Sequence, residues 1–294
     1  MSRRAKGRAI RSQAKEARME TKLLHIFRNT PLGRETLLQS IYFCNITRSS
    51  MVIYIPEYTK FLMYFDNDVV QVDLDPSYLL YPETSRTHAL DLTKAHGIDA
   101  SFFEPRQFTA STLPDIPVDF DFMCSPRSIS DLSSKISLGH IGTRVRRIIK
   151  TAQFPVLLTS PCYKEWTSIL VFFGGSVNSV KAVRLGLHIS RLTGLPLDLF
   201  TQVEGSQTMD DYKDRLKQAG LEADFDKRVR DWKVFADNGF EENLYHVPHQ
   251  ALAVLGAYGH GLVKDILFGS KMEVIQSVLS NNLLIVGPRY SAKG

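Results

Sequence analysis

The sequence has few of the residues that mark a disulfide-rich, zinc-binding or membrane-spanning protein. It has three cysteines in 294 residues, Cys44, Cys124 and Cys162, and no Cys-x-x-Cys pair. An odd number of widely spaced cysteines argues against a disulfide framework or a zinc site, and it favours reduced thiols in a cytoplasmic protein. No apolar run approaches the ~20 residues of a transmembrane helix. The beginning of the chain also lacks the apolar core of a secretory signal.

The positive charge is concentrated at one end of the chain. Residues 1–22 contain eight Lys or Arg and two Glu, which gives +6, so the remainder of a chain with net charge +5 carries −1. We interpret this segment as a basic, poorly ordered tail. Contact with nucleic acid or an anionic membrane is the lesser alternative, because no aromatic residue interleaves the basic ones. An organelle transit peptide is a third alternative, against which the two glutamates argue.

Short apolar runs alternate with helical patterns from residue 23 onward, which predicts an α/β fold. We expect two doubly wound, mainly parallel five-stranded sheet domains, Rossmann-like in type, over residues 23–159 and 166–290, joined by a linker at 160–165. Two alternating runs around Asp-Asn-Asp predict an extra β-hairpin in the first domain. A helix is expected over 85–97, with Ser85 as its N-cap. The similar closing runs FPVLLTSP and NLLIVGP suggest an internal duplication.

The segment GAYGHGLVKDILFGS carries the most specific pattern in the sequence. Gly256, Gly259 and Gly269 have two and then nine residues between them, and Ser270 follows the last glycine. Glycines at the carboxyl end of a strand allow close backbone approach to a ligand, and amides that open a helix attract phosphate. The segment therefore predicts a triphosphate cradle without a Walker lysine, and the alternative is that the glycines serve tight turns.

This spacing of Gly256, Gly259, Gly269 and Ser270 resembles the nucleotide motif of the universal stress protein family. The resemblance extends over residues 166–288 and more loosely over 23–159, like a tandem member of that family. It implies an adenine-nucleotide-binding α/β fold, with ATP, with or without magnesium, as the ligand of the second domain. It also implies an internal pseudo-dimer of the two domains and the possibility of a homodimer.

Two further residues of the second domain bear on the predicted nucleotide contacts. Gly174, in FFGGS, stands where the family has an acidic residue, so one contact to the nucleoside is missing while the turn itself is kept. Lys271 replaces a position that often offers a hydroxyl, and it either faces the phosphates or is solvated. Both are included with the motif residues as candidate nucleotide-binding positions.

The first domain departs further from the family pattern. Arg28 occupies the acidic position, and we place Cys124 and Arg127 at the two first motif glycines. Side chains at glycine positions block close backbone approach, so we expect no nucleotide in this domain. Arg28, Arg127 and His140 remain a candidate anion site.

The sequence gives no reason to expect a catalytic centre or a metal site. The closest histidines, His246 and His249, flank a proline and lack a carboxylate pattern. The loop residues of FGGSVNS match an ATP pyrophosphatase loop only in Gly174 and Gly175, and no nucleophile–base pair is apparent. We therefore expect a nucleotide-dependent stress-response sensor or regulator with an unidentified client protein and at most slow ATP hydrolysis. The alternative is a protein-interaction scaffold of the same fold that binds no nucleotide.

Overall fold

The structure is a computed structural model that describes residues 21–66, 68–105, 113–129, 141–203, 205–237, 239–258 and 278–291. Ten strands form one continuous sheet in the order β11-β10-β9-β12-β13-β8-β7-β1-β2-β5. The first half of the chain contributes β1 (Lys22–Ile26), β2 (Ser50–Tyr54), β5 (Ala100–Phe103), β7 (Phe122–Pro126) and β8 (Val156–Thr159). The second half contributes β9 (Ser168–Phe172), β10 (Leu197–Gln202), β11 (Val229–Phe235), β12 (Ala251–Gly256) and β13 (Leu283–Val286).

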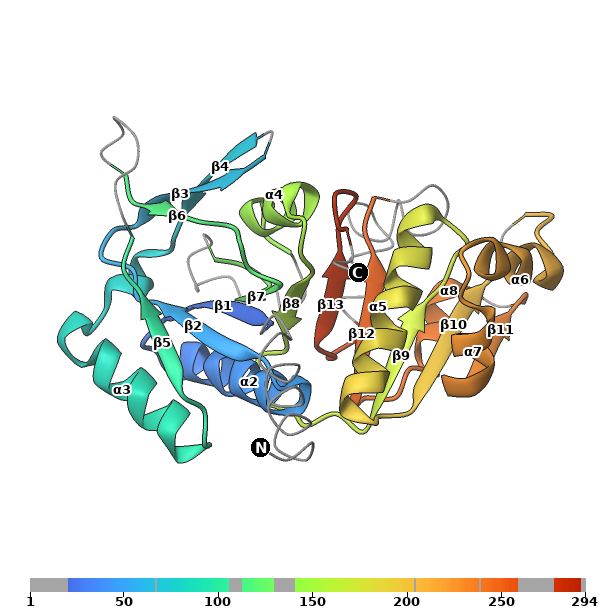
Figure 1. The fold of residues 1–294 in the computed structure, drawn as a ribbon, viewed down its shortest axis with the longest axis horizontal. Helices are drawn as coiled ribbons and strands as arrows, with labels where there is room; N and C mark the ends of the chain where they lie inside the picture. The colour runs from blue at the N-terminus through green and yellow to red at the C-terminus, as the bar shows by residue number, and fades with distance from the viewer. Residues whose placement is uncertain are drawn as a thin grey trace, which may run out of the picture.

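Each half uses the same strand order. If the five strands of each half are numbered in chain order, their order across the large sheet is 3-2-1-4-5 in both halves. Within the large sheet all pairings inside a half are parallel, and the two halves join through the antiparallel pair β8–β13, at the centre of Figure 1. Leu157 lies opposite Leu284 in that pair, with Val156 opposite Ile285 and Leu158 opposite Leu283. The mixed α/β class with a mainly parallel sheet is therefore confirmed, and the halves share one sheet.

Helices and a small second sheet cover the two faces of the large sheet. One face is covered by residues of α2 (Pro31–Thr47), α3 (Pro82–Ala95), α5 (Val177–Thr193) and α6 (Met209–Gln218). The other face is covered by α4 (Thr143–Thr151), α8 (Phe240–Leu244) and a three-stranded sheet of β3 (Lys60–Phe65), β4 (Asp68–Asp73) and β6 (Asp115–Ile116). Two further short helices in the described part of the chain are η1 (Pro76–Leu79) and α7 (Glu222–Arg228). Each buried apolar cluster contains residues of both halves, so the core is continuous across the junction.

The expected hairpin is present, and several local expectations need correction. Ser85 is not an N-cap, because α3 begins at Pro82, and the Ser85 hydroxyl instead donates to the carbonyl of Tyr81 inside the first turn. The helix begins early because Pro at its first position is pre-set for helical φ. Strand β1 begins at Lys22, which the sequence assigned to the basic tail, and residues 1–20 of that tail lie outside the described residues.

The linker lies against the first half. The main-chain N–H of Tyr163 donates to Glu35 and that of Lys164 to Gln39, both on α2. The Trp166 N–H donates to the Tyr42 hydroxyl, and the two rings meet edge to face. These bonds hold the connection along one helix of the first half.

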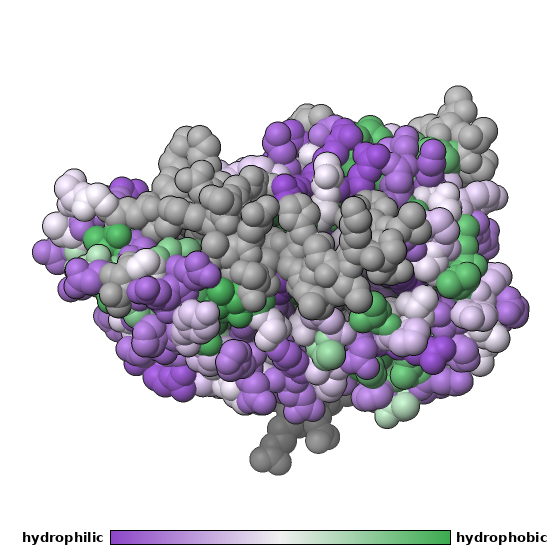
Figure 2. Space-filling view, turned by 180° about the vertical axis from the view of Figure 1, so that it is seen from behind, coloured by the Kyte–Doolittle hydropathy of each residue, from purple (hydrophilic) through white to green (hydrophobic). Residues whose placement is uncertain are grey.

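Most of the described surface seen in Figure 2 is hydrophilic, with hydrophobic residues in small scattered groups. Within the described part of the chain, no helix combines the length and apolar character needed to cross a bilayer.

Candidate functional site

The strand order creates one crevice of the same kind in each half. In an open α/β sheet, ligands bind at the carboxyl ends of the two strands where the order reverses. These strands are β9 and β12 in the second half, and β1 and β7 in the first. Because β8 and β13 are antiparallel, the two crevices lie at opposite edges of the continuous sheet.

In the second half, the turn after β9 leads directly into a long helix. Gly175 has φ +72°, which a glycine adopts without strain. The next residue, Ser176, is the N-cap of α5, and its hydroxyl accepts from the N–H of Ser179 at 3.1 Å. The first turn of this 17-residue helix therefore begins at the crevice, where its remaining N–H groups and the helix dipole favour an anion.

Gly256 ends β12 beside that first turn. A Cβ on Gly256 would lie 2.2 Å from the carbonyl oxygen of Asn178 and 2.7 Å from the amide nitrogen of Ser179. The Asn178 side-chain amide also donates to the carbonyl of Ala257, just beyond the strand. The glycine is therefore needed for close packing of α5 on β12, in addition to any role beside a ligand.

A cation covers the turn where the family pattern has an acid. Gly174 is half-buried, and Arg215 of α6 donates from Nη1 to the carbonyl of Gly175 at 2.8 Å. The ring of Tyr212 packs against the same glycine, at 3.3 Å from its would-be Cβ. Sequence reasoning missed Arg215, because the helical pattern of α6 predicts which face is buried but not which distant turn a basic side chain reaches.

The structure thus brings together Gly174, Gly175, Ser176 and Gly256 at one edge of the sheet. The other predicted nucleotide-binding residues, Gly259, Gly269, Ser270 and Lys271, lie outside the described residues, as does His140 of the candidate anion site. Their assignment stays a prediction.

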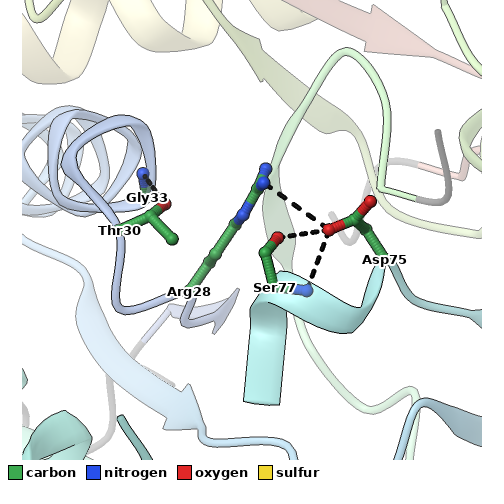
Figure 3. A network of polar contacts seen from close by, with 5 residues as sticks. All are labelled: Arg28, Thr30, Gly33, Asp75 and Ser77. Carbon is green, nitrogen blue, oxygen red and sulfur yellow. Dashed lines mark hydrogen bonds and ion pairs between the residues drawn. The ribbon is translucent and has the colours of Figure 1, made fainter. Parts of the chain in front are cut away.

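The first-half crevice is built from the same helix start with different side chains. Thr30 is the N-cap of α2 and accepts from the N–H of Gly33 at 3.2 Å, as Ser176 does in α5. In front of the cap, Arg28 forms an ion pair with Asp75 at 3.7 Å between Nη2 and Oδ1. Asp75 caps η1 by accepting from the N–H and the hydroxyl of Ser77 (Figure 3). Side chains of the protein therefore occupy the approach to this helix.

Strand register changes which first-half residues correspond to the glycine motif. His25 lies five residues before the cap Thr30 and pairs with Cys124, while Val171 lies five before Ser176 and pairs with Val254. Cys124 therefore corresponds to Val254, two residues before the first motif glycine. By the same count Pro126 corresponds to Gly256, and Arg127 to Ala257. The sequence matched Cys124 and Arg127 to motif positions that lie two residues too far along, because the loops were aligned without knowledge of the strand pairing.

Titratable groups in the first half are strongly affected by burial. His25 is fully buried beneath α2, with its Nδ1 at 2.8 Å from the Ser40 hydroxyl. Desolvation lowers the pKa of His25 to about 3, so the ring is neutral. Among the described residues no group of three or more His, Cys, Asp or Glu is placed to hold a metal ion.

Comparisons with known proteins agree with this architecture. A universal stress protein of Archaeoglobus fulgidus has a TM-score of 0.59 and 13% identity, over 92% of this chain and 99% of that chain. A Pseudomonas aeruginosa protein that is described as a universal stress protein has a TM-score of 0.54 and 14% identity, over 92% of this chain and 94% of that chain. At these identities the structures show a common fold, an α/β class with a Rossmann-like sheet in each half.

The sequence comparison finds a similar protein of the same kind. Universal stress protein Slr1230 of Synechocystis is 24% identical over 169 residues, which cover 55% of this chain and 56% of that protein. The match thus spans about half the length of the curated relative. No family model matches the chain. Taken together, the sequence match and the shared fold show that the chain is similar to universal stress proteins in about half of its sequence and in its fold.

Proposed function

We propose that the second half binds ATP or a related adenine nucleotide and that the protein acts as a stress-response sensor or regulator in the cytoplasm. Phosphate groups would lie on main-chain amides between the ends of β9 and β12, with magnesium as a possible companion ion. The surface around that crevice would change with nucleotide occupancy and would be read by a client protein. Any ATP hydrolysis would be slow.

One observation carries this proposal. Gly256, the first residue of the glycine pattern, ends β12 directly beside the capped start of α5. The spaced glycines that follow it in the sequence therefore begin at the crevice where the fold favours an anion. In the first half the Arg28–Asp75 ion pair occupies the equivalent position in front of α2.

A scaffold that binds no nucleotide is the second candidate, and one contact favours it. Arg215 lies over the Gly174–Gly175 turn, where a carboxylate acceptor for nucleoside hydroxyls would be expected. A guanidinium donates only, so it cannot replace that acceptor. Under this alternative the crevice is closed by the protein and the surface alone is used.

Calorimetric titration of magnesium-ATP into the full chain separates the two candidates. We expect binding below millimolar concentration and its loss in Gly259→Val, whose side chain would block the main-chain cradle. Gly256 is unsuitable for this test, because a substitution there collides with α5. Gly239→Val serves as the control, since no atom lies within 4 Å of its would-be Cβ. Absence of binding to the wild type would eliminate the nucleotide proposal, and unchanged affinity in Gly259→Val would place the nucleotide elsewhere.

A further inference from the structure

Arg127 is a buried cation that the described residues only partly satisfy. It is 8% exposed, and its Nη2 donates to the carbonyls of Leu279 and Asn281 at 3.2 and 2.9 Å. Within the described part of the chain its Nε and Nη1 have no hydrogen-bond partner, and no carboxylate forms an ion pair with it. Desolvation lowers the pKa of Arg127 to about 10. A buried charge without a counter-charge is costly, so the site favours a negative group.

Arg28 lies at the same edge of the sheet. His25 and Cys124 are paired in register across β1 and β7, and Arg28 and Arg127 each follow their strand's paired residue by three positions. Asp75, which pairs with Arg28, donates its N–H to the carbonyl of Ile129 at 2.7 Å, two residues beyond Arg127. The partner of one arginine therefore lies against the segment that carries the other.

Further buried polar atoms at this edge have no partner in the described part of the chain. They are Nε of Arg28, Oδ2 of Asp75 and the hydroxyl of Tyr78, over whose ring Arg28 lies at 5.4 Å. In Figure 3 the Arg28 guanidinium lies between the start of α2 and Asp75. Among the described residues, two guanidinium groups and one carboxylate leave one positive charge uncompensated, and Arg28 lies beside the positive end of the 17-residue helix α2.

We propose that Arg28, Arg127, Asp75 and Tyr78, the arginine cluster, form a binding site for a small phosphate-bearing anion in the first half. The phosphate oxygens accept from the two guanidinium groups, which suit phosphate geometry. Asp75 positions the Arg28 guanidinium through their ion pair and makes no hydrogen bond to the ligand. Recognition here uses side chains, unlike the main-chain cradle proposed for the second half, and the two sites are independent.

Thermal unfolding with inorganic phosphate tests this site, with chloride at matched ionic strength as the reference. We expect phosphate to raise the Tm of the full chain beyond chloride, because an anion that binds only the folded state stabilises it. Arg28→Gln should weaken phosphate binding at least tenfold. Asp75→Asn should strengthen it, because it removes the only carboxylate of the cluster, and a purely structural role for Asp75 would not give this result. Arg184→Gln, which changes an exposed arginine of α5, should leave the phosphate effect unchanged.

Two comparisons keep this inference separate from the nucleotide proposal. Arg127→Gln also removes bonds to Leu279 and Asn281, so its own Tm is expected to fall, and the readout is the phosphate-dependent increment alone. That increment should survive Gly259→Val. No phosphate effect beyond chloride, or an effect that persists in Arg28→Gln, would overturn the inference. An effect that disappears in Gly259→Val would also overturn it and would place the anion in the second half.

Discussion

The two halves of the molecule begin their first helices in the same way and then differ in what they place before them. Thr30 and Ser176 cap α2 and α5 through the same hydrogen bond, to the N–H three residues on. Two residues before the cap, the first half has Arg28 and the second has Gly174. A common backbone plan therefore carries different groups before the helix, a charged side chain in the first half and a glycine turn in the second. The fold alone does not define the ligand.

Substitutions at the junction between the halves should lower stability most, and by similar amounts on its two sides. Leu157 and Leu284 are fully buried and lie opposite each other in the β8–β13 pair. Leu157→Ala and Leu284→Ala should each lower the free energy of unfolding by about 3 kcal/mol, from lost burial and a residual cavity. Denaturant unfolding measures this. A loss at one position several times that at the other would contradict the equivalence of the halves.

The close approach of Gly256 to α5 should give a somewhat smaller effect. A Cβ there would lie 2.2 Å from the Asn178 carbonyl oxygen, so Gly256→Ala should cost about 2 kcal/mol by overpacking. Gly239→Ala, at an open position, is the matched control and should change the unfolding midpoint little. An unchanged midpoint for Gly256→Ala would show that the helix and strand are less tightly packed than the structure indicates.

The pH dependence of stability should have a contribution from the first half that the second lacks, because His25 of the first half corresponds to Val171 of the second. The folded-state pKa of His25 is about 3, below its ordinary value, so the unfolded chain binds the proton more readily. Its contribution to stability is complete above pH ~6.5 and is lost as the pH falls toward 3, by about 2 kcal/mol at pH 5. The difference between wild type and His25→Val, followed by unfolding from pH 7 to 5, isolates this effect. Parallel pH profiles would contradict it.

The helix caps should give the smallest effects and the closest match. Thr30→Ala and Ser176→Ala each remove one cap hydrogen bond, and each should lower stability by about 1 kcal/mol. Circular dichroism during thermal unfolding provides the measurement. Ser176→Ala should also lower the affinity of the second-half crevice for an anion, since the ordered first turn of α5 supplies the amides there. If one of the two substitutions lowered stability and the other did not, the two helix caps would not be equivalent.

Much of the architecture could be predicted because buried strands here are short apolar runs. The apolar runs at 23–27, 168–173 and 251–256 coincide, to within one residue at each end, with β1, β9 and β12, and Asp-Asn-Asp marks the hairpin between β3 and β4. Helix α7 was missed, because its sequence EADFDKR contains a single large apolar side chain and so has little periodicity. The continuous sheet was also missed, since the β8–β13 pairing depends on contacts far apart in the sequence.

The candidate sites were predictable only in part. Spacing predicts a ligand role for the glycines that follow β12, which stays a prediction, and the structure shows that Gly256 permits the close approach of α5. Nothing local to Asp75 or Arg215 indicates that they reach Arg28 and Gly175. The misplacement of Cys124 has the same origin, because loop spacing carries no information about which residues pair across strands.

The difference between the halves can be measured by counting bound nucleotides per chain, using native mass spectrometry with magnesium-ATP. We expect one nucleotide per chain, lost in Gly259→Val and retained in Arg28→Gln, because the proposed nucleotide site lies in the second half. Two nucleotides per chain, or one that is lost in Arg28→Gln and retained in Gly259→Val, would contradict this expectation.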